Sequence, residues 1–105
     1  MREVIVKVHN VAAGILTELG DNPSQATYRF HYFEDYEGAP VSLTMPVKGK
    51  NFEYTQLPPF FDGVLPEGGQ LEGLLRTHKI DRYNYLSQLI AVGQDLVGAV
   101  TVFEK

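Results

Sequence analysis

The alternation of apolar and polar side chains predicts strands in the first half of the chain. From Arg2 to Val8, valines at every second position alternate with other residues, which is the pattern of a strand with one buried face. Similar alternation predicts further strands over residues 15–19, 26–33, 41–45 and 52–54. Turn-forming residues separate the first of these segments, among them His9, Asn10, Gly14 and the run 21–24. We therefore expect a small, mainly antiparallel sheet or a partly closed barrel.

The apolar spacing changes to that of helices after residue 70. Four residues lie at i, i+3, i+4 and i+7 on one helical face, namely Leu71, Leu74, Leu75 and His78. A second helix is predicted over residues 81–92, with Asp81 as its N-cap and Gly93 as a left-handed C-cap. Residues 98–104 predict a closing strand that pairs with the N-terminal strands, because an unpaired strand exposes its hydrogen-bonding groups. Strands, two helices in the C-terminal half and a final strand predict one α+β domain spanning residues 1–105.

Composition narrows the class of protein. The chain has 105 residues, 44% of them apolar, which suits one globular domain. It has no cysteine, so disulfides, thiol catalysis and the usual structural zinc sites are excluded. No apolar run approaches the roughly 20 residues that cross a bilayer, and no signal-peptide pattern is visible, so a cytoplasmic location is expected. The formal charge is −4 and the nine basic residues are dispersed, so direct binding to nucleic acid is not expected.

The residues that could act in catalysis or bind a metal form no recognisable catalytic or metal site in the sequence. The three histidines are far apart, and the acidic loop at residues 34–37 lacks the spacing of a calcium loop. The glycine pair at 68–69 lacks the lysine of a phosphate-binding loop. The aromatic residues Tyr28, Phe30 and Tyr32 favour a sheet core over a nucleic-acid stacking surface at this net charge. We therefore predict no catalytic residue, no metal and no cofactor.

One segment between the predicted strands and helices, residues 57–69, stands out and is called the apolar connection below. It reads LPPFFDGVLPEGG, with three prolines, three glycines and two adjacent phenylalanines. Prolines remove backbone donors and glycines permit conformations that other residues avoid, so a loop is expected rather than a helix or a strand. Because loops normally lie on the surface, these apolar side chains either fold back into the core or contact a partner.

The run from Leu57 to Gly68 resembles the PPFF-x-x-LLPEG signature of the N-terminal subdomain of HipA-type kinases. Other segments agree in order: an opening strand–turn–strand, the run Val41–Pro46 before a charged turn, two helices, and Gly98-Ala99-Val100 near the end. The resemblance covers nearly the whole chain, and the twelve-residue signature is specific. Val64 departs from the leucine that is common in the family, yet it keeps the segment apolar.

The resemblance implies a protein that is not itself a kinase. The phosphate-binding loop, ATP-anchoring lysine, catalytic aspartate and metal ligands of HipA-type kinases lie beyond this subdomain, and these 105 residues contain none of those motifs. We expect a free-standing counterpart of the subdomain, similar to the HipS antitoxins of three-gene HipBST toxin–antitoxin systems. The implied partners are a HipA-like kinase toxin (HipT-like) and, through the kinase, a helix-turn-helix protein (HipB-like). The implied function is neutralisation of the kinase by protein contact.

The apolar connection supplies the predicted partner-binding residues: Phe60, Phe61, Asp62, Gly63, Val64, Leu65, Pro66 and Glu67. Apolar side chains held by prolines and glycines would act as rigid anchors, and a few such anchors carry most of the energy of a protein interface. Adjacent side chains of an extended segment point to opposite sides, so one phenylalanine is expected to face the core and the other the partner. The tip, residues 62–65, is expected to contribute little to the core.

Two other classes of function remain open. The protein is alternatively a structural subunit that completes the kinase fold without inhibiting it, or an unrelated ligand-binding domain whose apolar connection is a lid. Growth of cells that express the kinase with and without this protein separates the first two possibilities. A thermal-shift ligand screen addresses the third.

The sequence predicts that the isolated protein does not hydrolyse ATP, because it contains neither a nucleophile–base pair nor a nucleotide-binding motif. Phosphate release should therefore equal that of buffer controls when the protein is free of contaminating kinase. Release above the controls, reproducible across preparations, would contradict this prediction.

Overall fold

The fold is a single antiparallel sheet with helices from the C-terminal half, in a computed structural model that describes residues 2–20, 22, 25–93 and 99–105. The strands are β1 (Arg2–Val8), β2 (Val11–Leu19), β3 (Thr27–Tyr32), β4 (Asn51–Tyr54) and β5 (Val100–Glu104). The helices are α1 (Pro59–Val64), α2 (Gly68–His78) and α3 (Tyr85–Val92), with a short 3₁₀ turn, η2 (Val47–Gly49). The sheet order is β4-β3-β2-β1-β5. The predicted α+β class is confirmed, as an open sheet within the described residues.

Most of the predicted strands are present, with shifted bounds. The second predicted strand begins earlier, at Val11, and directly follows the turn at His9 and Asn10. The final strand pairs with β1 in antiparallel register, with Val102 opposite Val6, as predicted for the C-terminal segment. The predicted start of that strand at residue 98 lies outside the described residues.

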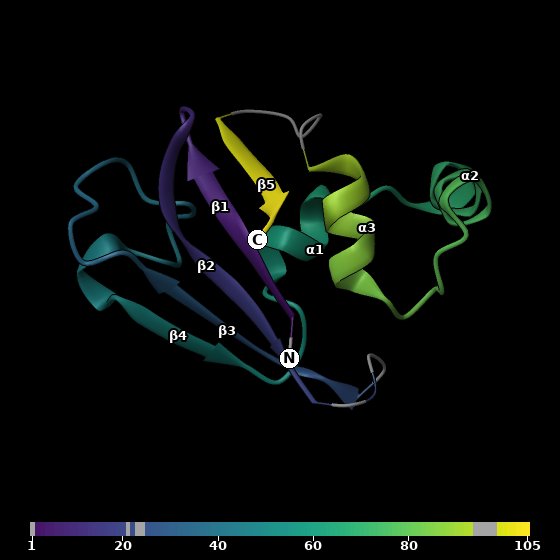
Figure 1. Ribbon diagram of the computed structural model, residues 1–105, viewed down its shortest axis with the longest axis horizontal. Coiled ribbons are helices and arrows are strands. Elements are labelled where there is room, and N and C mark those ends of the chain that lie inside the picture. The colour runs from purple at the N-terminus through teal and green to yellow at the C-terminus, as the bar shows by residue number, and fades with distance from the viewer. Residues whose placement is uncertain (1, 21, 23–24, 94–98) are drawn as a thin grey trace.

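One face of the sheet packs against α1 and α3. Helix α3 lies beside β1 and β5 (Figure 1), and Phe61 of α1 packs against Phe30 of β3. The predicted alternation of β1 is confirmed, because Val4, Val6 and Val8 are buried and their neighbours are half-buried. The core continues through larger residues of the sheet and the helices: Leu16, Tyr28, Phe30, Tyr32, Phe61, Leu86, Leu89 and Val102. Each large apolar side chain removed from water contributes about 1.5–3 kcal/mol to the free energy of folding.

Helix α2 lies outside this core. In Figure 1 it is the helix farthest from the sheet, beyond α3, with which it is in contact. The predicted helix is confirmed, but none of its residues is buried. Leu71, Leu74 and Leu75 are half-buried, and His78 is exposed at the end of the helix. The apolar face of α2 is therefore only partly covered by the described residues.

The segment 41–45 is a tight turn and not the predicted strand. Val41 and Met45 are buried, whereas Leu43 between them is 94% exposed. The Tyr32 hydroxyl accepts a hydrogen bond from the Val41 N–H at 2.9 Å and donates one to the Met45 carbonyl. The alternation of apolar residues here therefore reflects a turn, and not a strand, and both ends of the turn are hydrogen-bonded to one buried tyrosine.

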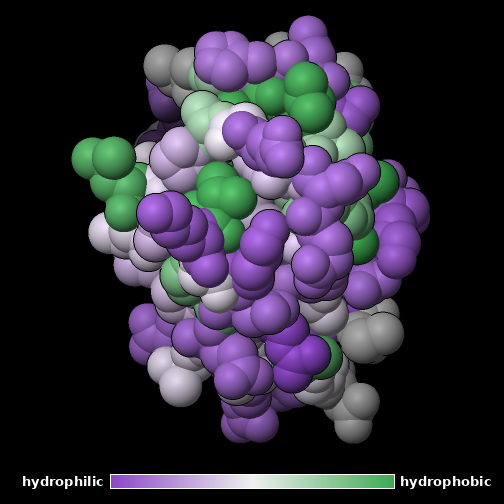
Figure 2. All heavy atoms as spheres, turned by 90° about the vertical axis from the view of Figure 1, so that its left-hand side faces the viewer, coloured by the Kyte–Doolittle hydropathy of each residue, from purple (hydrophilic) through white to green (hydrophobic). Residues whose placement is uncertain are grey.

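The face of the molecule in Figure 2 carries no broad apolar surface. Hydrophobic residues appear there as small separate areas among hydrophilic ones. Single exposed apolar residues are normal on protein surfaces, so neither this face nor Leu43 alone indicates a binding site.

Helix α3 begins at Tyr85, later than predicted, and Asp81 is not its N-cap. The cap is Asn84, whose Oδ1 accepts hydrogen bonds from the Ser87 N–H at 3.3 Å and from Arg2 Nη1 at 2.9 Å. Arg2 also donates to Ser87 Oγ at 2.8 Å. Because Arg2 is 82 positions away in the sequence, local pattern could not indicate this choice of cap.

Two positions require glycine because the backbone of a neighbouring strand approaches too closely for a Cβ atom. Gly14 lies inside β2 and not in the predicted turn, and a Cβ there would be 2.2 Å from the His31 carbonyl oxygen. Gly93 has a φ of −57°, so the predicted left-handed cap is wrong. A Cβ on Gly93 would lie 2.1 Å from the Val102 carbonyl oxygen. The Val102 N–H also donates to the Gly93 carbonyl at 3.0 Å, which joins the end of α3 to β5.

Replacing Gly93 by alanine should destabilise the fold, because the added methyl group must displace the backbone of β5. Overpacking of this kind costs about 1–3 kcal/mol of the free energy of unfolding. Urea unfolding followed by circular dichroism measures the loss. Gly63→Ala is the matched control: its Cβ meets nothing within 4 Å, so stability should be unchanged or rise by up to about 1 kcal/mol. A Gly93→Ala variant as stable as the wild type would show that β5 moves freely.

Candidate partner-binding site

The apolar connection begins with the short helix α1, so the prediction of a loop there is wrong. Pro58 precedes the helix and Pro59 occupies its first turn, where the N–H that proline lacks would have no helical partner. The Pro58 carbonyl accepts hydrogen bonds from the N–H groups of Phe61 and Asp62, both at 3.0 Å. Leu65 ends the helix in an extended conformation, with ψ at 147°, as favoured for a residue before proline.

One face of α1 belongs to the core. Phe61 is fully buried, and its ring centroid lies 6.3 Å from that of Phe30. Leu65 is 9% exposed, so the expectation that the tip contributes little to the core is wrong for this residue. Phe60 is half-buried and packs against the same core, with its ring nearly perpendicular to that of Phe61. Successive residues of a helix point about 100° apart, and this separates the two phenylalanines. With Phe61 buried, α1 is part of the core.

The outer surface of the apolar connection is formed by the remaining predicted residues. Asp62, Gly63 and Glu67 are exposed, and Val64 and Pro66 are half-buried. A Cβ at Gly63 would meet no atom within 4 Å, so this position faces open space. The predicted residues that retain accessible surface are Phe60, Asp62, Gly63, Val64, Pro66 and Glu67.

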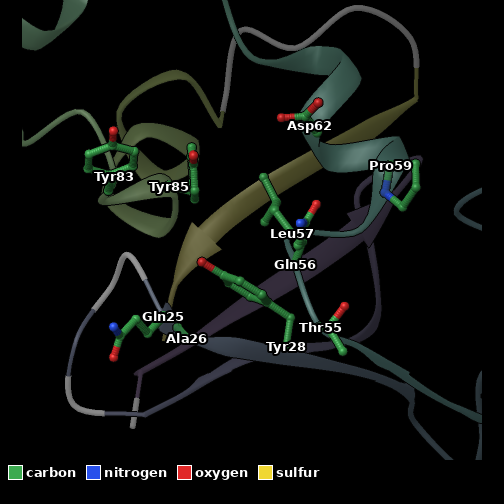
Figure 3. A pocket seen from close by; sticks show the side chains of 10 residues that line it. All are labelled: Gln25, Ala26, Tyr28, Thr55, Gln56, Leu57, Pro59, Asp62, Tyr83 and Tyr85. Carbon is green, nitrogen blue, oxygen red and sulfur yellow. The ribbon is translucent and has the colours of Figure 1, made fainter.

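A cleft of about 480 Å³ lies between α1 and the segment that leads into α3 (Figure 3). Asp62 stands on the α1 side, and Tyr83 and Tyr85 stand opposite. Tyr28 and Leu57 lie between the two sides, at the base of the cleft. A volume of this size falls within the range of about 300–1,000 Å³ that is typical of small-ligand sites.

A second hollow of about 280 Å³ adjoins the cleft across Asp62, Tyr83 and Tyr85. It extends along the apolar connection through Leu65, Pro66 and Glu67 and reaches Leu71 of α2. Neither tyrosine was singled out from the sequence, because both fall within the helix predicted over residues 81–92. Tyr83 instead precedes α3 and is 50% exposed. The signal that could have found them is a pair of tyrosines two residues apart at the start of a helix.

Beneath the cleft, buried polar side chains are paired. The Tyr28 hydroxyl donates a hydrogen bond to Glu18 Oε2 at 3.2 Å, and these residues are 2% and 4% exposed. Burial, followed by the adjacent Glu18 carboxylate, raises the pKa of Tyr28 well above its ordinary value, so the phenol stays protonated. The bonds from Arg2 to Asn84 and Ser87 hold the segment before α3 in place beside this pair.

Other classes of site find no support in the described part of the chain. Within it, no group of three or more histidine and carboxylate side chains could hold a metal ion. Tyr28, Phe30 and Tyr32 belong to the core, as predicted, each at most 2% exposed. His31 packs edge-on against Phe33 with ring centroids 6.4 Å apart. Among the described residues, no helix has the length and apolar character needed to cross a membrane.

Among the matches to known proteins are the following two relatives and one solved structure. An uncharacterised protein of Haemophilus influenzae is 31% identical over 78 residues, which make up 74% of each chain. The serine/threonine-protein kinase toxin HipA of Shewanella oneidensis is 28% identical over 93 residues, which are 87% of this chain but 21% of the kinase. A solved structure described as the N-terminal domain of HipA toxin matches all of this chain and 93% of its own, with a TM-score of 0.74. Its 24% sequence identity makes this a likeness of fold.

The family assignment follows from the extent of the match. Residues 4–103 match the family model of the HipA N-terminal domain, which leaves only the first three and last two residues outside. The signature of the apolar connection and the fold agree with that assignment. The chain spans about a fifth of the kinase relative, so the shared part is one domain of that protein. The chain belongs to the HipA N-terminal domain family.

Proposed function

We propose that this protein is a HipS-like antitoxin, which binds a separately encoded HipA-like kinase and neutralises it by protein contact. The observation that carries the proposal is the match of residues 4–103 to a domain that also occurs within a much longer kinase. A domain that forms part of a kinase in one protein has surfaces suited to the rest of that kinase. A separate copy of the domain would occupy the same surfaces in trans.

Two further observations support this proposal. The alignment with the Haemophilus relative covers 74% of that protein, which favours a domain that also occurs apart from a kinase chain. The net charge of −4 disfavours direct contact with DNA, so a helix-turn-helix partner of HipB type would join through the kinase. The kinase itself would be of HipT type. Inhibition would then depend on contact area and not on chemistry performed by this chain.

We assign the contact to the outer surface of the apolar connection. Most of its accessible residues sit on α1, which is anchored in the core by Phe61 and by Leu65 at its C-terminal end. A surface held this rigidly loses little conformational entropy when a partner binds. The adjoining cleft and hollow, which share Asp62, are depressions in this surface that a partner side chain could enter.

Replacing Gly63 by tryptophan should block binding without disturbing the fold, because the new side chain projects into open space at the centre of the assigned surface. Affinity for the HipA-like kinase should fall by about 2 kcal/mol or more, roughly thirtyfold. Growth of cells that express the kinase should no longer be restored. Calorimetry on the purified pair and growth curves measure these two effects.

Ala12→Trp is the matched control, since Ala12 is exposed at the β1–β2 hairpin and remote in sequence from the apolar connection. This variant should bind and neutralise as the wild type does. Equal affinity of the two tryptophan variants would remove the assigned surface from the interface. A wild type that binds the kinase without restoring growth would identify a structural subunit instead of an antitoxin.

Substitutions at Leu65 and Val64 should separate the contribution of the tip to fold stability from its contribution to kinase affinity. Leu65→Ala should lower the free energy of unfolding by about 2–5 kcal/mol, because its side chain is buried in the core. Val64→Asp should remain folded, since Val64 is half-buried at the edge of the helix, and should weaken kinase affinity about tenfold or more. Thermal midpoints and titrations of both variants test this pair. A Leu65→Ala variant with the wild-type midpoint would contradict the burial of the tip.

A further inference from the structure

The cleft between α1 and the Tyr83–Tyr85 segment has one charged group on its walls. Of the described residues that line it, Asp62 is the only acid and none is basic. Asp62 is exposed and has no ion pair with another described residue, whereas the nearby Arg82 is paired with Glu72. In Figure 3 the Asp62 carboxylate points from α1 toward the side that carries Tyr85. The cleft therefore presents a negative charge that has no described counterpart.

The base of the cleft offers a hydrogen-bond acceptor. The single proton of the Tyr28 hydroxyl is directed to the buried Glu18 carboxylate, so the phenol oxygen can only accept further hydrogen bonds. In Figure 3 this hydroxyl ends below Tyr85, on the opposite side of the cleft from Asp62. A ligand with several hydrogen-bond donors would meet acceptors at both of these points.

The wall opposite Asp62 is aromatic. Tyr83 is 50% exposed and Tyr85 is half-buried. Asn84 between them is held by Arg2 and by the first turn of α3, so the backbone that carries both rings is fixed. The face of an aromatic ring attracts a cation, and a planar guanidinium can stack on it.

Three features together select the class of occupant. An anion would be repelled by Asp62, and an apolar group would desolvate the carboxylate without replacing its hydrogen bonds. A lysine ammonium is compact and strongly hydrated, so it could pair with Asp62 but would use the rings and the distant acceptor poorly. An arginine guanidinium carries five donors in a plane and stacks on tyrosine, which matches all three features.

We propose that this cleft receives an arginine side chain of the kinase partner, which pairs with Asp62 and stacks against the Tyr83–Tyr85 wall. The inference rests on the proposed function and names the kind of partner residue that the surface recognises. Asp62 belongs both to the cleft and to the outer surface of the apolar connection, so the arginine enters at the edge of the assigned interface.

The test is the kinase affinity of Asp62→Asn, which removes the charge and keeps the shape of the side chain. Affinity should fall about tenfold or more, and its dependence on salt should flatten, because a paired charge is lost. Asp35→Asn is the matched control, since it makes the same change in net charge at an exposed loop position. The control substitution should leave kinase affinity nearly unchanged.

Exposed arginines of the kinase are then replaced by glutamine, one at a time. The arginine that enters the cleft is the one whose replacement no longer lowers affinity in the Asp62→Asn background.

A second probe is independent of the kinase. N-acetyl-arginine amide, added at millimolar concentration to isotopically labelled protein, should shift the amide signals of Asp62, Tyr83 and Tyr85, whereas the neutral citrulline analogue should not.

Equal affinities of Asp62→Asn and Asp35→Asn would overturn the arginine site and leave the proposed function standing. A wild type that binds no kinase would instead defeat the proposed function, and the arginine titration alone would then decide: selective shifts support the site and their absence overturns it.

Discussion

The packing of Phe61 against Phe30 is the contact on which the helical side of the molecule depends. It seats α1 on the sheet at β3, and both rings are fully removed from water. Because a helix turns about 100° per residue, the depth of Phe61 also determines that Asp62 and Gly63 point outward. The two prolines before Phe61 start the helix at that point and thereby set which residues become surface.

In the proposed function the same helix serves stability through one face and recognition through another. The inner face of α1 is continuous with the core, and the outer face borders the cleft that Asp62 shares with Tyr83 and Tyr85. The opposite wall of that cleft is held by Arg2, which connects the first strand to the beginning of α3. The proposed contact with a kinase would benefit from this preorganised surface, because each group ordered in advance reduces the entropy lost on association.

The sequence by itself determined the class of the fold and the family. Alternation in β1 and β3 reflects which side of each strand is buried, and helical spacing in α2 reflects which side is half-buried. Both are local properties that spacing records directly. The proline- and glycine-rich signature of the apolar connection pointed to the HipA N-terminal domain, which the match over residues 4–103 bears out. Aromatic residues of β3 were correctly predicted as core because the chain carries too little positive charge for a nucleic-acid platform.

Only the tertiary structure decided the features that are formed by residues distant from one another in the sequence. Asn84, and not Asp81, caps α3 because Arg2 reaches it from β1. Residues 59–64 become helical because the sheet offers Phe61 a buried position, which outweighs the low helix propensity of Gly63, and because Pro58 and Pro59 stand at the helix start, where proline is tolerated. The cleft exists only because that helix and the segment around Tyr83 meet across space. Local pattern records the environment of one element at a time, whereas a site between elements depends on how they pack.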